Sequence, residues 1–213
     1  MINRLLLTAV LITLCTDPLH ADQVTAFAIN TSSIAGTQGS IDFQFNPGPL
    51  GSQAATVQIL NFSGGGYAGS QVKTGAASGG PVGNAPLILS NATSYNDDFE
   101  SFNFGNFVFF VLDFSGPAVN SPDHVSASGS SFAFSMFSNR AGTQPALTPD
   151  PAGFAGVVNL NLNGSITALA ISPELQIVPE PASFCLAVAF LVAISVTRLR
   201  RKRALPAGQR TDA

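Results

Sequence analysis

Apolar and polar side chains alternate in the stretch SIDFQFN, residues 40–46. Ile41, Phe43 and Phe45 fall on one side of an extended chain, because successive side chains of a strand point to opposite faces. The sequence NPGP follows, in which proline removes a ladder donor and glycine permits a turn. The pattern predicts a β-strand with one buried face, and no segment between residues 22 and 178 has a convincing helical period.

Similar runs recur along the chain. We expect strands at residues 55–62, 86–90, 99–104, 106–114, 125–137 and 156–172, and loops at 63–69 and 145–151. The apolar run at 106–114 predicts a central strand, and Asn163-Gly164 predicts a hairpin within the last run. Seven to nine short strands joined by turns predict an all-β fold, an antiparallel β-sandwich of jelly-roll type with phenylalanine as the bulky core residue.

Both ends of the chain differ from this body. A positive start and the apolar run at residues 5–14 predict a secretory signal peptide that is cleaved after Ala21. Residues 182–199 predict a short transmembrane helix, whose uncharged part spans about 24 Å. Basic residues at its end orient that end toward the cytoplasm, and they are Arg198, Arg200, Arg201, Lys202 and Arg203.

The body between these ends, residues 22–178, has two basic and nine acidic residues, a formal charge of −7. This balance argues against nucleic-acid binding, because phosphate neutralisation requires lysine and arginine. Cys15 and Cys185 both lie outside the body, so the cysteines say nothing about a disulfide within it.

Asp97, Asp98 and Glu100 form the densest acidic cluster of the body. A hard cation such as calcium takes several oxygen ligands, and this cluster can supply some of them, although its spacing differs from that of an EF-hand loop. The alternative is a solvated turn at a strand edge, where charges oppose aggregation. We therefore expect no cofactor, with calcium as the one candidate ion.

Tyr67 and Tyr95 are the candidate ligand-binding residues, both expected in loops. Sugar sites use exposed aromatic rings that combine an apolar face with a polar group, whereas the alternative is a pair of ordinary loop tyrosines. His124 follows Asp123, but the chain has no G-x-S-x-G motif and the body has no cysteine nucleophile. We therefore expect a protein that is not an enzyme.

Val178-Pro179-Glu180-Pro181, the apolar span after it and RLRRKR together resemble the PEP-CTERM sorting signal of Gram-negative and related bacteria. The resemblance implies recognition by an exosortase, a membrane protease-transpeptidase, after export by the secretion machinery to the bacterial membrane. It also implies a link to exopolysaccharide and biofilm. The segments GSIDFQFNPGP, FNFGNFVFFVLDFSGPA and SSFAFSMF resemble uncharacterised PEP-CTERM cargo proteins, for which no activity is implied.

The sequence thus divides into a signal peptide at 1–21, an exported β-sandwich at 22–176, a sorting signal at 177–203 and a cytoplasmic tail at 204–213. The resemblance implies that the protein is anchored transiently and then released to the cell surface or extracellular matrix. We expect a structural or adhesive role there. The alternative is a carbohydrate-binding module of the exopolysaccharide matrix.

Overall fold

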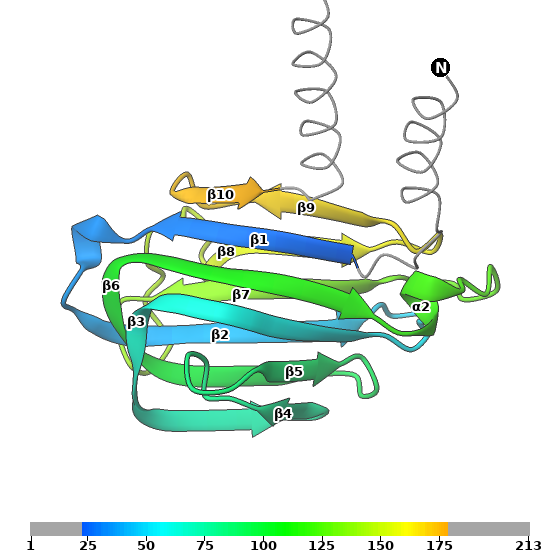
Figure 1. Ribbon diagram of the computed structural model, residues 1–213, viewed down its shortest axis with the longest axis horizontal. Coiled ribbons are helices and arrows are strands. Elements are labelled where there is room, and N and C mark those ends of the chain that lie inside the picture. The colour runs from blue at the N-terminus through cyan, green and yellow to red at the C-terminus, as the bar shows by residue number, and fades with distance from the viewer. Residues whose placement is uncertain (1–22, 179–213) are drawn as a thin grey trace, which may run out of the picture.

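The computed structural model describes residues 23–178, which form antiparallel β-structure with two short helices (Figure 1). The helices are the 3-10 helix η1 (Ser32–Ile34) and α2 (Pro117–Asn120). The strands in this range are β1 (Gln23–Asn30), β2 (Gln38–Pro47), β3 (Thr56–Thr74), β4 (Ala77–Gly79), β5 (Leu87–Ser90), β6 (Asp97–Ser115), β7 (Ser130–Phe137), β8 (Phe154–Leu160), β9 (Ile166–Ala170) and β10 (Leu175–Val178). All pairings found among them are antiparallel, and the expectation of an all-β fold is confirmed.

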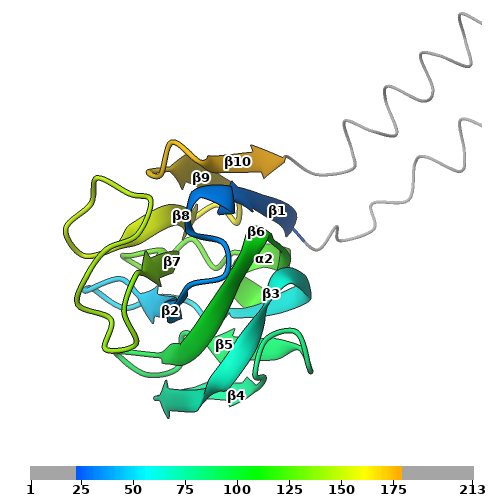
Figure 2. The same ribbon diagram turned by 90° about the vertical axis from the view of Figure 1, so that its left-hand side faces the viewer.

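Two long strands, β3 and β6, form a ribbon that bends over and takes part in two layers (Figures 1 and 2). The first half of β6 pairs with β2, and its second half pairs with β1. The strand order is β4-β5-β3-β6-β2-β7-β8-β9, with β10 on the far side of β1. One continuous sheet therefore supplies both layers, and the ribbon connects them.

The two layers meet through phenylalanine side chains. The ring of Phe110 in β6 lies 4.9 Å from that of Phe134 in β7 and 5.5 Å from that of Phe43 in β2. The ring centroids of Phe27 in β1 and Phe132 in β7 lie 6.3 Å apart, although these two strands do not pair. Most of these rings meet edge to face, the arrangement that aromatic pairs prefer. These contacts give the fold its sandwich-like core.

The apolar face of β2 is buried, as the alternation predicts, but the expectation that its polar face is solvated is wrong. Ile41, Phe43 and Phe45 are fully buried, as expected. The polar face is not solvated, because Ser40 is 0% exposed and Asp42 is 7% exposed. The loop after β7 packs over this face, and the hydroxyl of Ser40 donates to the carbonyl of Asn139 over 2.9 Å.

The expected loop at 63–69 and the expected break at Gly105 are both wrong, because β3 and β6 continue through these positions. The ribbon bends here, with register shifts between Leu60 and Gly65. Gly64 has φ of +101°, and a Cβ atom there would lie 1.8 Å from the carbonyl oxygen of Phe107. A Cβ atom at Gly105 would lie 2.1 Å from the carbonyl oxygen of Gly64. Glycine is therefore required because the two backbones touch at the bend.

Three strands were not expected, namely β1, β4 and β10. In β1 the buried residues Thr25, Phe27 and Ile29 alternate with small residues, so the period-two pattern is weak. The expected hairpin at Asn163-Gly164 is confirmed by the pairing of β8 with β9. Its turn is closed by a hydrogen bond of 3.0 Å from the Gly164 N–H to the Asn161 carbonyl, and Gly164 has φ of +81°.

The chain enters and leaves the domain side by side. Ala26 in β1 pairs with Val178 in β10, so residues 177 and 178 belong to the sheet as well as to the sorting segment assigned from the sequence. The predicted signal peptide at 1–21 and the predicted transmembrane helix at 182–199 lie outside the described residues. Within residues 23–178, no helix is long and apolar enough to cross a membrane.

Candidate functional site

Asp98 and Glu100 lie in the interior of the domain. Both side chains are fully buried, on the face of β6 that joins the core. A hydrogen bond joins the two carboxyl groups, and Nε2 of Gln71 donates to both, over 3.1 Å to Asp98 and 3.0 Å to Glu100. The backbone N–H of Val82 donates to Oε1 of Glu100 over 3.0 Å. We call Asp98 and Glu100 the buried carboxyl pair.

Burial is the largest influence on this pair. It raises the pKa of Glu100 to about 8, with further increases from the hydrogen bond to Asp98 and from the charge of Asp98. Burial also raises the pKa of Asp98, against the effect of its hydrogen bonds to Glu100 and Gln71. At neutral pH Glu100 therefore keeps its proton and donates it to Asp98.

Asp97 points to the opposite side of β6, because side chains alternate along a strand. There it interacts with Asp42 of β2 and is hydrogen-bonded to the side chain of Tyr95. Burial raises the pKa of Asp42 to about 7, although Nε2 of Gln44 donates to its carboxyl group over 2.6 Å. The structure thus brings Asp97 and Tyr95 together and separates both from the buried carboxyl pair.

The three expected calcium ligands are therefore not gathered on one face of the strand. Residues 23–178 contain no group of three or more histidine, cysteine, aspartate and glutamate side chains that could hold a metal ion. A signal for this separation exists in the sequence. When the predicted strand at 99–104 is extended by two residues, period-two alternation puts Asp97 and Asp98 on opposite faces.

The two candidate tyrosines do not form a shared surface. Tyr67 is not in a loop but in β3, where it pairs with Phe102 of β6. Tyr95 precedes β6 in a loop, as expected, and is 44% exposed. Burial, with the nearby Asp42 and Asp97, raises the pKa of Tyr95 to about 12. From Asp97 to Phe102 the strand runs roughly 17 Å, which is too far for both rings to contact one sugar.

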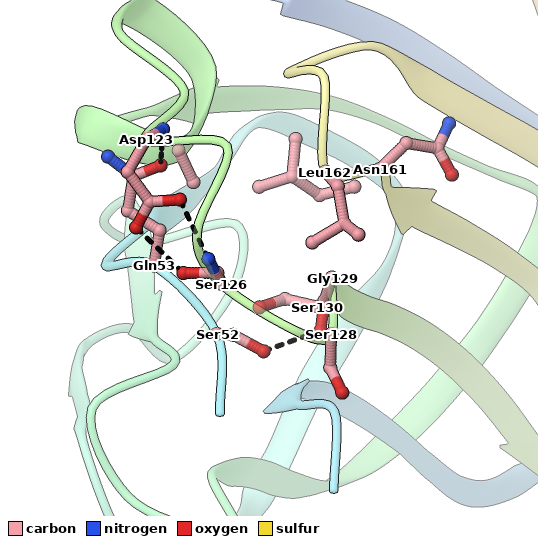
Figure 3. Close-up of a pocket in the computed structure, with 11 residues that line it drawn as sticks. Ser52, Gln53, Asp123, Ser126, Ser128, Gly129, Ser130, Asn161 and Leu162 are labelled. Carbon is pink, nitrogen blue, oxygen red and sulfur yellow. Dashed lines mark hydrogen bonds between the residues drawn. The ribbon is translucent and has the colours of Figure 1, made fainter. Parts of the chain in front are cut away.

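The loop that contains Asp123 and His124 is stabilised by the Asp123 carboxylate (Figure 3). The carboxylate accepts hydrogen bonds from the N–H groups of Val125 and Ser126, each over 3.0 Å, and from the Ser126 hydroxyl over 2.8 Å. These bonds lower the pKa of Asp123. The adjacent hollow has a volume of about 10 Å³, room for roughly one water molecule. The carboxylate is therefore used to shape its own loop.

A larger groove shares part of its lining with this hollow. Its volume is about 420 Å³, and it lies at the end of the layer that contains β2, β7 and β8. It is lined by residues 46–49, 128–131 and 159–162, and no acidic or basic side chain is among them. We call it the amide groove.

Polar side chains form a row across this groove. Asn46, Ser131 and Asn159 are directly opposite one another on β2, β7 and β8. The hydroxyl of Ser131 donates to Oδ1 of Asn159 over 3.0 Å. The amide nitrogen of the exposed Asn159 has no hydrogen-bond partner among the described residues. Because adjacent strands lie roughly 5 Å apart, the polar groups recur at about that spacing.

Asn161 continues the row beyond β8. Its amide nitrogen donates to the hydroxyls of Ser165, over 3.1 Å, and Thr167, over 2.9 Å. These bonds fix the amide and leave its Oδ1 without a partner in the described part of the chain. In Figure 3 the amide points away from the small hollow. The apolar part of the groove comes from Pro47, Pro49 and Leu162.

The amide groove was not found from the sequence, because three segments far apart in the chain form it. The one feature of the sequence that indicates it is the alternation NLNLN at 159–163. If the leucines face the core, this alternation puts the asparagines on the outer face of the sheet. Of the sorting motif expected from the sequence, only Val178 is described. Pro179, Glu180, Pro181 and the basic residues at 198–203 lie outside the described range.

Comparison with known proteins finds no matching family model, no similar curated protein and no similar solved structure.

Proposed function

We propose that the protein is an exported β-sandwich of jelly-roll type, released at the cell surface or into the extracellular matrix, where its role is structural or adhesive. The pairing of the last strand with the first supports this proposal most strongly. β10 ends at Val178, opposite Ala26. Val178 is also the first residue of the Val-Pro-Glu-Pro motif, so β10 lies on the N-terminal side of Pro179 and includes only residues 177 and 178 of the proposed sorting segment.

This arrangement suits a chain that is cut between its domain and its anchor. A cut at Pro179, Glu180 or Pro181 leaves all 4 residues of β10 in place beside β1. A cut before Leu175 would remove β10 and expose the edge of β1, and an open strand edge promotes association. The position of the motif therefore allows the domain to be released intact.

The proposed partners follow from the resemblance of the sorting segment. The secretion machinery exports the chain, residues 182–199 hold it in the bacterial membrane, and an exosortase cuts it. The formal charge of −7 on residues 22–178 supports a partner other than nucleic acid. Catalysis is not part of the proposal, since the carboxylate next to His124 is bound within its own loop.

The proposal is tested by fractionating cells of a bacterium that encodes an exosortase. The full chain is compared with a variant that carries Pro179→Ala, Glu180→Ala and Pro181→Ala. We expect the unmodified chain at the surface or in the medium, and the variant in the membrane fraction. Pro149→Ala, Asp150→Ala and Pro151→Ala, in the similar sequence PDP before β8, form the matched control and should not change the distribution. Equal distribution of all three chains would overturn the proposal.

A further inference from the structure

We propose that the amide groove binds a neutral polysaccharide, with sugar hydroxyls held by Asn159 and Asn161 and the apolar face of a sugar ring against Pro47, Pro49 and Leu162. The inference rests on the proposed function, because it names the matrix component to which the released domain would adhere. It differs from the tyrosine-based sugar site expected from the sequence, since neither Tyr67 nor Tyr95 lines this groove.

The size and lining of the groove favour such a ligand. Its volume of about 420 Å³ falls within the range of ligand-binding pockets, roughly 300–1,000 Å³. The lining combines amide and hydroxyl groups with apolar surface and contains no charged side chain. A sugar has matching chemistry, because hydroxyl groups surround a ring whose faces consist of C–H groups.

The unused hydrogen-bonding groups are complementary to hydroxyls. The amide of Asn159 offers two N–H donors, because only its oxygen is bonded within the domain. The amide of Asn161 offers its oxygen as an acceptor, because its nitrogen is already bonded twice. The two residues are separated by one position in the chain and flank the buried Leu160. A sugar hydroxyl both donates and accepts, so adjacent hydroxyls can satisfy both amides.

The groove is held in shape before a ligand arrives. The Ser52 hydroxyl donates to the Gly129 carbonyl over 2.6 Å, and the Leu50 N–H donates to the Ser128 hydroxyl over 3.0 Å. Asn91 donates to the Ser130 hydroxyl over 2.7 Å in the interior beneath. The first two bonds join the loop after β2 to the segment before β7, and the third joins the segment after β5 to the start of β7. A groove fixed in this way loses little conformational entropy on binding.

Other classes of ligand fit less well. The acidic body repels polyanions, and no lysine or arginine lines the groove to bind them. A peptide that adds a strand needs an open sheet edge. Here β2, β7 and β8 each have a neighbouring strand on both sides. A neutral polysaccharide requires neither a cation nor an open edge.

Isothermal titration calorimetry tests the inference. The full chain, purified in a detergent without a sugar headgroup, is titrated with neutral hexasaccharides of glucose, mannose and galactose, and with a hexasaccharide of uronic acids. We expect binding of at least one neutral hexasaccharide and weaker or no binding of the uronic-acid chain. Asn159→Ala should weaken the binding by about three- to tenfold, because it removes hydrogen bonds to the ligand.

Asn103→Ala is the matched control. Asn103 is also exposed on a strand, and its Oδ1 likewise accepts one side-chain hydrogen bond, from Gln38 over 3.2 Å, but it does not line the groove. This variant should bind as the unmodified chain does. Absence of binding to every neutral hexasaccharide, a preference for the uronic-acid chain, or equal losses in both variants would overturn the inference. Release of the protein in the fractionation experiment would be unaffected by any of these results, so the two proposals fail separately.

Discussion

At the scale of single residues, the buried carboxyl pair is the least expected feature of the domain. Asp98 and Glu100 occupy core positions where apolar side chains are usual, and both are 0% exposed. They are accommodated because Glu100 donates a hydrogen bond to Asp98 and because Gln71 and Val82 supply further donors. A buried carboxyl group that keeps its proton makes the stability of the domain depend on pH.

The direction of this dependence follows from the pKa of Glu100, which is raised to about 8 from an ordinary value of 4.5. The folded domain therefore holds a proton that the unfolded chain releases between these two values. The contribution of Glu100 to stability is greatest below pH 4.5 and is lost as the pH rises toward 8. We expect the free energy of unfolding, measured by urea denaturation, to fall between pH 5 and pH 8. The slope for one proton is at most about 1.4 kcal/mol per pH unit.

Glu100→Gln should reduce this slope, because glutamine keeps a hydrogen-bond donor for Asp98 and an acceptor for Val82 without a titrating proton. The matched control is Glu174→Gln, at a position outside the buried carboxyl pair, which should leave the slope unchanged. Stability that increases from pH 5 to pH 8, or the same slope in all three chains, would contradict this assignment.

At the scale of elements, the bend in the β3–β6 ribbon determines the architecture. The ribbon carries the sheet from one layer to the other, and a Cβ atom at Gly64 or Gly105 would overlap the backbone of the opposite strand. The neighbouring Gly66 has nothing within 4 Å of a Cβ atom. Gly64 and Gly66, two positions apart in one run, therefore differ in what an added side chain would contact.

Gly64→Ala should destabilise the domain by roughly 2–4 kcal/mol, because φ of +101° is strained for alanine and because the new Cβ atom would overlap the Phe107 carbonyl. Gly66→Ala, the matched control, should change the free energy of unfolding by less than about 1 kcal/mol. Urea denaturation followed by circular dichroism measures both values. Equal effects at the two positions would show that the bend is not built on backbone contact at Gly64.

Strand alternation could be predicted wherever the two faces differ clearly in polarity, as in β2 and β7. The bend in the β3–β6 ribbon could not be predicted, because a run of three glycines is expected in a loop as readily as at a bend where two backbones touch. β1 was missed because alanines separate its buried residues, which weakens the contrast between its faces. The amide groove depends on the order β2-β7-β8, and no local pattern specifies which strands become neighbours.

At the scale of the whole molecule, the domain is closed by the pairing of β1 with β10. Leu175 of β10 is 5% exposed and lies opposite Ile29. A chain that ends at Val178 should unfold with the same free energy as the longer protein, because β10 is retained. A chain that ends at Pro173 should lose about 3 kcal/mol or more, because it loses a buried leucine and a strand pairing. Urea denaturation of both truncated chains checks this prediction. Equal free energies of unfolding for the two chains would contradict it.

The central claim is that the domain is exported and then cut away from its anchor. The most direct test is the intact mass of the mature protein, purified from its native host. We predict a chain that starts near Asp22 and ends between Val178 and Pro181, with the complete sheet and without residues 182–213. A mature chain that still ends at Ala213 would show a permanent anchor and would contradict the claim.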